Sequence, residues 1–353
     1  MRALIGMSGG VDSSTAAYLM IHAGYQCIGA TMRLYTGQDC PGCSLPDGAE
    51  DAACVCDALG IPFHRLDLSE EFQRLVMDAF VADYEAGLTP NPCIQCNRHL
   101  KFDLFAQAAR KLDCDCIVTG HYAQITTHPV TGRLVLQKAV DAAKDQTYFL
   151  YTLTQAQLAF TRFPLGSLSK AQAREIAQSQ GLCNAQKRDS QDICFVPDGD
   201  YRAFLHRYTG KTYPAGRYLD LEGNVLGSHT GAVGYTIGQR KGLGIALGAP
   251  AYVCSKNMAE NTVTLGPNEA LFRTTLLATD LNWMAFEQPA DALRVKAKAR
   301  SRMIEQLATV YPQPDGSVQV VFDEPQRALT PGQAVVFYDG DLVLGGGTVA
   351  EVL

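Results

Sequence analysis

The sequence predicts an α/β fold, a doubly wound parallel sheet, followed by a small β domain and a C-terminal β-barrel. Strand-like apolar runs alternate with helix-length stretches through about residue 204, which is the pattern of a parallel sheet covered by helices. Beyond that point, short alternating strands and glycine-rich turns dominate. A chain of 353 residues is also longer than a single core usually fills. We therefore expect domains at 1–204, 205–268 and 269–353.

The elements of the first domain follow from local patterns. Strands are expected at 3–7, 26–34, 63–68 and 114–119, and helices at 15–23, 49–59, 70–85 and 99–112. Gly24 and Gly60 stand where glycines end helices. Two further helices are expected between 145 and 182, with Ser169 capping the second. Ligands of such sheets bind at the carboxyl ends of the strands.

The first of these strand ends carries the most informative motif, Ser-Gly-Gly-Val-Asp-Ser-Ser at 8–14. Gly9 and Gly10 allow positive φ and a close approach of the backbone to a ligand. The free N–H groups of the following helix then point at an anion in the turn. The lysine of a Walker loop is missing. The motif resembles the pyrophosphate loop of ATP pyrophosphatases, which cleave ATP to AMP and pyrophosphate.

Composition places few limits on the partners. The net charge of −6 shows no general affinity for nucleic acid, so any basic surface must be local. No apolar run approaches the ~18–20 residues of a membrane span, and the residues before the glycine turn are too few for a signal-peptide core. We expect a cytoplasmic protein without a membrane partner.

Twelve cysteines suggest metal binding or catalysis in a reducing compartment. Cys96 follows a proline-stiffened segment, and we expect a helix to begin just beyond it, at Arg98. The helix dipole and nearby cations should lower the pKa of Cys96 and make it a candidate nucleophile. Cys194 becomes of interest as the second thiol of a pair with Cys96.

The cysteines allow two metal hypotheses as well. Cys40 and Cys43, with Cys93 and Cys96, satisfy the paired CxxC rule for tetrahedral zinc. Alternatively, Cys93, Cys96 and Cys194 would suit an iron–sulfur cluster with one open iron. The residues leave both hypotheses open.

A basic strand is predicted in the last domain. Its cations alternate with small or apolar residues, so all fall on one strand face: Arg294, Lys296, Lys298, Arg300 and Arg302. No acidic residue lies between Asp291 and Glu305. A phosphate-binding stripe is one interpretation, and a solvated strand face is the other.

Taken together, these segments resemble the bacterial tRNA-specific 2-thiouridylase family along the whole chain. The matching segments are GMSGGVDSS at 6–14, TPNPCIQCNRHLKF at 89–102, GHYA at 120–123, KDQTYFL at 144–150, RDSQDICFV at 188–196, YTIGQRKGLG at 235–244 and PGQAVVFY at 331–338.

The resemblance implies roles for individual residues. The ATP-binding positions are Gly6, Met7, Ser8, Gly9, Gly10, Val11, Asp12, Ser13, Met32 and Gly120. The positions that contact tRNA or its target base are Asn91, Pro92, Cys93, His121, Lys144, Asp145, Gln146, Arg300, Ser301 and Gln333. Cys194 corresponds to the residue that carries sulfur as a persulfide, and Cys96 to the nucleophile paired with it.

The implied reaction begins when ATP, with Mg2+, adenylates the C2 oxygen of the wobble uridine (position 34) of tRNA, which is flipped into the pocket. Persulfide sulfur then replaces that oxygen to give 2-thiouridine, AMP and pyrophosphate. The implied partners are tRNA and a persulfide donor, and the implied oligomeric state is a monomer. Cys93 departs from the aspartate common in the family, which favours a [4Fe-4S] variant of the chemistry. Ser301 departs from a tyrosine, and the CPGC segment at 40–43 has no assigned role.

Two other function classes remain at this stage. A small-molecule ligase with the same glycine turn would need neither thiols nor a basic β domain. A zinc-stabilised tRNA-binding module would bind tRNA without ATP turnover.

Overall fold

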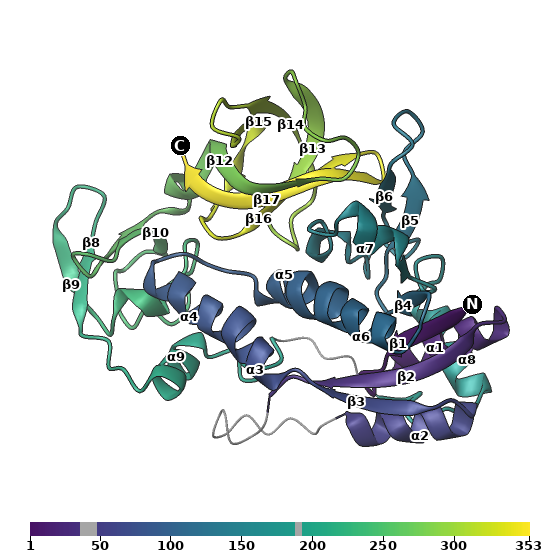
Figure 1. The fold of residues 1–353 in the computed structure, drawn as a ribbon. Coiled ribbons are helices and arrows are strands. Elements are labelled where there is room, and N and C mark those ends of the chain that lie inside the picture. Colours follow the sequence, from purple (N-terminus) through teal and green to yellow (C-terminus); the bar gives the residue numbers. More distant parts are fainter. Residues whose placement is uncertain (36–47, 188–192) are drawn as a thin grey trace.

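The computed structural model describes residues 1–35, 48–187 and 193–353. Its first part is a parallel sheet in the order β3-β2-β1-β4-β7 (Figure 1). The strands are β1 (Arg2–Gly6), β2 (Gln26–Arg33), β3 (Phe63–Asp67), β4 (Cys116–Val118) and β7 (Thr161–Arg162). The first four lie within two residues of their predicted bounds. The predicted fold class is confirmed.

Helices cover this sheet, and most of them follow the local rules. They are α1 (Val11–His22), α2 (Ala49–Leu59) and α8 (Lys170–Ser179), with the short α7 (Gln155–Ala159) and the 3-10 turn η3 (Thr147–Phe149). Gly60 ends α2 with φ +65°, as expected of a helix C-terminal glycine. Ser169 caps α8 as predicted, and its side chain accepts from the Gln172 N–H while the Gln172 side chain returns to Ser169.

A long helical hairpin carries Cys93 and Cys96 in its second arm. Its first arm is α3 (Ser69–Phe72), the π-helical turn η1 (Gln73–Met77) and α4 (Asp78–Glu85). Its second arm is α5 (Pro92–Gln95), the π-helical stretch η2 (Cys96–Leu104) and α6 (Phe105–Lys111). The predicted start of this second arm near residue 99 is wrong. Asn91 caps the helix and Pro92 occupies its first turn, where proline needs no N–H partner.

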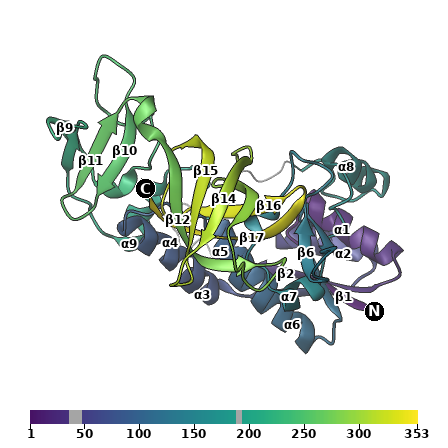
Figure 2. The same ribbon diagram turned by 90° about the horizontal axis from the view of Figure 1, so that it is seen from above.

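The middle of the chain folds as a four-stranded sheet in the order β10-β11-β8-β9. Its strands are β8 (Gly216–Leu219), β9 (Val225–His229), β10 (Tyr252–Asn257) and β11 (Thr262–Gly266). Helix α9 (Tyr201–Thr209) precedes it, and the 3-10 turns η4 (Ala232–Gly234) and η5 (Asn268–Leu271) complete it. In the view from above, this sheet and the parallel sheet lie at opposite ends of the molecule, with the barrel between them (Figure 2).

The C-terminal strands close into an antiparallel barrel. They are β12 (Phe272–Trp283), β13 (Leu293–Lys298), β14 (Gln306–Pro312), β15 (Val318–Arg327), β16 (Ala334–Asp339) and β17 (Leu342–Val352). The pairing of β12 with β17 closes the ring. A hairpin from the first part of the chain, β5 (Gln124–Thr127) and β6 (Leu134–Gln137), joins β17 through the pair Gln137 and Leu342.

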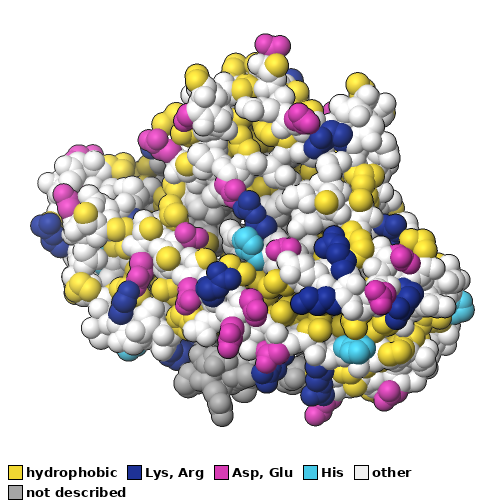
Figure 3. All heavy atoms as spheres, viewed as in Figure 1, with side chains coloured by type: hydrophobic (Ala, Val, Ile, Leu, Met, Phe, Trp, Pro, Cys, Tyr) yellow, Lys and Arg dark blue, Asp and Glu magenta, His cyan; other side chains and the backbone are white. Residues whose placement is uncertain are grey.

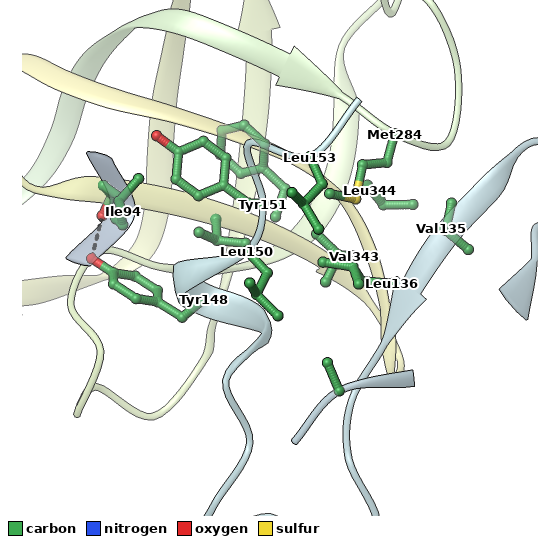
Figure 4. Packing of buried hydrophobic residues seen from close by; sticks show 14 of the residues in the cluster. Ile94, Val135, Leu136, Tyr148, Leu150, Tyr151, Leu153, Met284, Val343 and Leu344 are labelled. Carbon is green, nitrogen blue, oxygen red and sulfur yellow. Dashed lines mark hydrogen bonds between the residues drawn. The ribbon is translucent and has the colours of Figure 1, made fainter. Parts of the chain in front are cut away.

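The barrel shares its core with the first part of the chain. One buried cluster runs from Leu4 and Phe105 of the sheet layer to Trp283 and Phe337 of the barrel. Figure 4 shows side chains of the segment 148–153 packed beside Val343 and Leu344 of β17. In the described ranges, no helix is long and apolar enough to cross a membrane.

Candidate active site

The glycine turn lies between β1 and α1, and its own hydroxyls hold its shape. Gly9 has φ +69° and Gly10 is the N-cap residue of α1. The Ser8 N–H donates to Ser13 Oγ at 3.2 Å, and Ser13 Oγ–H donates to the Gly10 carbonyl at 2.9 Å. The first N–H groups of α1 therefore face the turn, as an anion site requires.

Two glycines in this region have no room for a side chain. A Cβ on Gly9 would lie 2.3 Å from the Gly48 carbonyl oxygen. A Cβ on Gly120 would lie 2.8 Å from the backbone N of Ser13. The turn is thus enclosed by the residue before α2 on one side and by the end of β4 on another.

Asn184 holds the turn from a third side, and sequence analysis missed it. This residue is 4% exposed, and its Nδ2 donates to the Gly9 carbonyl at 3.1 Å and to Ser14 Oγ at 2.8 Å. Nothing in the local sequence identifies Asn184, because it lies some 170 residues after the glycine turn in the chain.

Asp12 is fixed by two partners that were also missed. Its carboxylate accepts from Lys170 Nζ at 2.8 and 2.9 Å and from the Tyr122 hydroxyl at 2.8 Å. Tyr122 follows the predicted site residue His121, and Lys170 follows the predicted helix cap Ser169.

A cavity of about 640 Å³ opens over the turn. It brings together ten of the predicted site residues: Gly6, Met7, Ser8, Asp12, Ser13, Met32, Gly120, His121, Gln146 and Cys194. Gly9 and Val11 are buried and Gly10 caps α1, so these three shape the turn. The cavity also includes Tyr35, Gly48 and Lys101, none of which was predicted to act there.

The thiols of Cys93, Cys96 and Cys194 lie close enough for their charges to interact. The pKa of Cys194 is raised to about 12, first by burial and then by Cys96 and Cys93, because one thiolate disfavours another. Lys101 acts in the opposite direction on all three. The structure thus gathers the predicted pair, with Cys93 beside it and one cation facing them.

The predicted lowering of the Cys96 pKa is wrong. Burial raises this pKa, because Cys96 is only 8% exposed. Because the helix begins at Pro92, the Cys96 N–H already donates to the Pro92 carbonyl and is not a free helix-terminal group. Desolvation therefore outweighs the effect of Lys101.

Tyr35 positions the Cys194 backbone at the cavity wall. Its hydroxyl donates to the Cys194 carbonyl oxygen at 2.6 Å. Its ring stacks on Phe72 with 5.9 Å between centroids, and Phe72 meets Phe195 edge-on at 5.8 Å. This aromatic row fixes the residue next to Cys194.

The predicted tRNA-contact residues near the cavity differ in what they do. His121 is buried, shares a 2.8 Å hydrogen bond with Thr119 Oγ1, and has a pKa held well below its usual value by desolvation. Gln146 accepts from the Tyr122 N–H at 2.8 Å. Asp145 accepts from the Ala139 N–H and the Thr147 hydroxyl, and burial raises its pKa. Lys144 is half-buried in the turn before them.

Gln333 joins the barrel to the segment that precedes the thiols. Its Nε2 donates to the Thr89 carbonyl at 2.7 Å, and the Thr89 N–H donates to the Pro331 carbonyl at 2.9 Å. Asn91, Pro92 and Cys93 follow directly, and Asn91 Oδ1 accepts from the Cys93 N–H at 3.2 Å. The barrel therefore fixes where α5 begins.

The predicted stripe of five cations on one strand face is wrong. Strand β13 ends at Lys298, and Arg302 lies in the following turn. Arg294 forms an ion pair with Asp323. Arg300 donates to the Ala328 carbonyl and to the Thr330 hydroxyl, and half-buried Ser301 follows it.

The acidic residues that face these cations come from other segments of the chain, so the local sequence around the strand could not reveal them. The pKa of Lys298 is lowered by burial, and the nearby Asp145 and Glu305 partly restore it. Figure 3 likewise shows cationic and acidic side chains mixed over the face drawn.

Of the two metal hypotheses, the described residues include every ligand of the iron–sulfur cluster but only half of the ligands of the zinc site. Cys40, Cys43 and the segment 188–192 lie outside the described residues. Among the residues that are described, no three His, Cys, Asp or Glu side chains are grouped so as to hold a metal ion. The described positions of Cys93, Cys96 and Cys194 thus do not fit a cluster.

Three family models match the chain in succession. They are described as a tRNA methyl transferase HUP domain over residues 1–198, a tRNA methyl transferase PRC-barrel domain over 202–267, and an aminomethyltransferase beta-barrel domain over 273–349.

Curated relatives match over the full length. The tRNA-specific 2-thiouridylase MnmA of Clostridioides difficile (strain 630) is 47% identical and covers 100% of this chain and 99% of its own. The proteins of the same name from Lachnoclostridium phytofermentans and Acetivibrio thermocellus are 47% and 46% identical, each covering 99% of both chains.

Proposed function

The chain belongs to the tRNA-specific 2-thiouridylase family, and from this membership and the site geometry we propose how its residues act. It is an enzyme, a sulfurtransferase that binds ATP and modifies tRNA. One observation carries the proposal for the site. Cys194 lines the same cavity as the glycine turn, while its thiol interacts electrostatically with that of Cys96.

The first step is adenylation. The turn at 8–13 and the N-terminus of α1 hold the phosphates of ATP, and Met32 and Gly120 enclose the nucleotide. The C2 oxygen of the wobble uridine (position 34) attacks the α-phosphorus, and pyrophosphate leaves. Mg2+ would arrive bound to the phosphates and neutralise their charge. Asp12 lines the cavity and would be the carboxylate available to such an ion, and Lys170 and Tyr122 hold it in place.

The second step is sulfur transfer. A donor persulfide passes its outer sulfur to Cys194. In one route the outer sulfur attacks C2 and AMP leaves, after which Cys96 attacks Cys194 Sγ, breaks the S–S bond and frees 2-thiouridine. In the other route Cys96 attacks Cys194 Sγ first and releases the outer sulfur as sulfide, which displaces AMP from C2. Both routes leave a Cys96–Cys194 disulfide, which two equivalents of an external thiol reduce. Lys101 favours the thiolate at each of these cysteines.

The remaining predicted residues bind or position the tRNA. His121 and Gln146 line the cavity and would contact the flipped base, and Asn91, Pro92 and Cys93 would meet that base from the start of α5. His121 is neutral at pH 7 because burial lowers its pKa, so it acts as a hydrogen-bonding group and not as a phosphate cation. Lys144, Arg300 and Ser301 would meet the tRNA backbone. Gln333 acts through Thr89, whose segment it holds.

A cluster-dependent variant of this chemistry is not our proposal, because the described thiols do not fit one. Iron and sulfide assays after anaerobic purification test that choice. We further propose the domain boundaries 1–204, 205–268 and 269–353, a monomer, and a cytoplasmic location where tRNA and thiol reductants occur.

The test combines the protein, ATP, unmodified tRNA and a persulfide donor, and measures 2-thiouridine and pyrophosphate. Cys96→Ser and Cys194→Ser should abolish 2-thiouridine, while Cys254→Ser, a half-exposed thiol of β10, should not. If Cys96→Ala and Cys194→Ala left turnover intact, the chain would be a ligase that shares only the glycine turn. ATP-independent tRNA binding with one zinc per chain would instead indicate a binding module.

A further inference from the structure

A second pair of thiols lies outside the proposed reaction. Cys54 belongs to α2 and Cys183 to the turn after α8, and both are exposed. The Cys54 thiol is a hydrogen-bond partner of the Cys183 thiol. Cys183 Sγ also lies 4.0 Å from the Asp51 carbonyl, one helical turn before Cys54. No local sequence pattern joins the two thiols, because Cys183 lies far from Cys54 in the chain.

The contact between the two segments does not depend on the thiols alone. Lys187 Nζ lies 2.5 Å from Asp51 Oδ2, which joins the same two segments by an ion pair. The thiols therefore face each other across a junction that is already held in place. This matters because a disulfide forms readily only where the backbone geometry brings the two sulfurs together.

Both segments hold the glycine turn. Asn184, the residue after Cys183, donates to the Gly9 carbonyl and to Ser14 Oγ. Gly48, the N-cap residue of α2, approaches Gly9 so closely that a Cβ there would meet its carbonyl. A covalent link between Cys54 and Cys183 would pull together two of the walls that shape the ATP site.

We propose that Cys54 and Cys183 are a reversible dithiol–disulfide pair that reacts with small-molecule disulfides and alters the affinity of the glycine turn for ATP. One protein thiolate attacks the small disulfide and releases one small thiol. The other protein thiolate then attacks the mixed disulfide and releases the second. Both protein thiols are oxidised, and the small disulfide is reduced to two thiols. Neither cysteine enters the thiolation reaction, so the inference goes beyond the proposed function.

The surroundings slow this exchange at neutral pH. The pKa of the Cys183 thiol is raised to about 11, first by partial desolvation where the two segments meet, then by the Cys54 thiol and by Asp51. Only the thiolate exchanges. Formation of the disulfide should therefore be slow at neutral pH and quicken as the pH rises.

The covalent step is tested on the full chain with glutathione disulfide. After alkylation of the remaining thiols, cleavage before aspartate releases Cys54 within residues 51–56 and Cys183 within 145–188. We expect a linked peptide pair, two hydrogens lighter than the free peptides, with fragmentation assigning the bond to Cys54. Cys54→Ser should remove it and Cys254→Ser should keep it. Alkylation of both thiols, or a bond from Cys183 to another cysteine, would overturn the pairing.

The coupling is tested by calorimetric titration with α,β-methylene ATP. Oxidation should change the dissociation constant by about fivefold or more, the lower end of usual coupling between sites, and dithiothreitol should reverse the change. Cys54→Ser, which keeps Cys96 and Cys194, should show no such change after the same treatment. A disulfide that leaves the dissociation constant unaltered would overturn the coupling. This measurement needs no tRNA and no sulfur donor, so its failure is distinct from a failure of the proposed function.

Discussion

Removing the Tyr35 hydroxyl should slow sulfur transfer and leave adenylation unchanged. Tyr35→Phe keeps the ring that stacks on Phe72 and deletes the donor to the Cys194 carbonyl. A hydrogen bond of this kind contributes about 0.5–1.5 kcal/mol. If that energy is what holds Cys194 in its reactive position, the rate of 2-thiouridine formation should fall about 2- to 13-fold, since 1.36 kcal/mol is tenfold in rate.

The assay separates the two steps. Pyrophosphate release in a single turnover reports adenylation, which precedes the involvement of Cys194, and 2-thiouridine reports the sulfur step. Tyr25→Phe is the matched control, because Tyr25 precedes β2 while the cavity lies at that strand's other end. An equal fall in both products would refute the reasoning, as would an unchanged sulfur step.

Three further predictions follow from the same contacts. Gly9→Ala should weaken ATP binding by more than about tenfold in calorimetric titration, because left-handed φ costs ~1–2 kcal/mol and the new Cβ would meet the Gly48 oxygen. Gln333→Ala should lower the free energy of unfolding by about 0.5–1.5 kcal/mol in urea titration and reduce tRNA thiolation more than ATP binding, since it frees Thr89. Alkylation of Cys194 by iodoacetamide, followed by mass spectrometry, should quicken about tenfold per pH unit from pH 7 to 10, because a pKa raised to about 12 keeps the thiolate scarce throughout that range. A rate independent of pH would show a preformed thiolate.

Rules that use only neighbouring residues predicted correctly those elements whose structure is set by neighbouring residues. The glycine turn, the capping of α8 and the strand positions follow from residues within a few places of one another. The pairing of Cys96 with Cys194 came from family resemblance, since no spacing rule joins residues so far apart.

The sequence alone did not show how deeply a side chain is buried or which residues far along the chain would contact it. The pKa of Cys96 depends on how deeply its helix is buried, which a helix-start rule does not contain. Arg294 looked uncompensated until the barrel placed Asp323 opposite it. Asn184 and Lys170 reach the turn from about 160–175 residues away.

The core shared between the parallel sheet and the barrel has a consequence for biosynthesis. The apolar segment around Tyr148 to Leu153 is completed by residues as late as Val349. At ~5–20 residues per second, a ribosome needs roughly 10–40 s to add those intervening residues. During that interval the nascent N-terminal half exposes an apolar surface. A chain truncated before the barrel should therefore bind chaperones and be prone to aggregate.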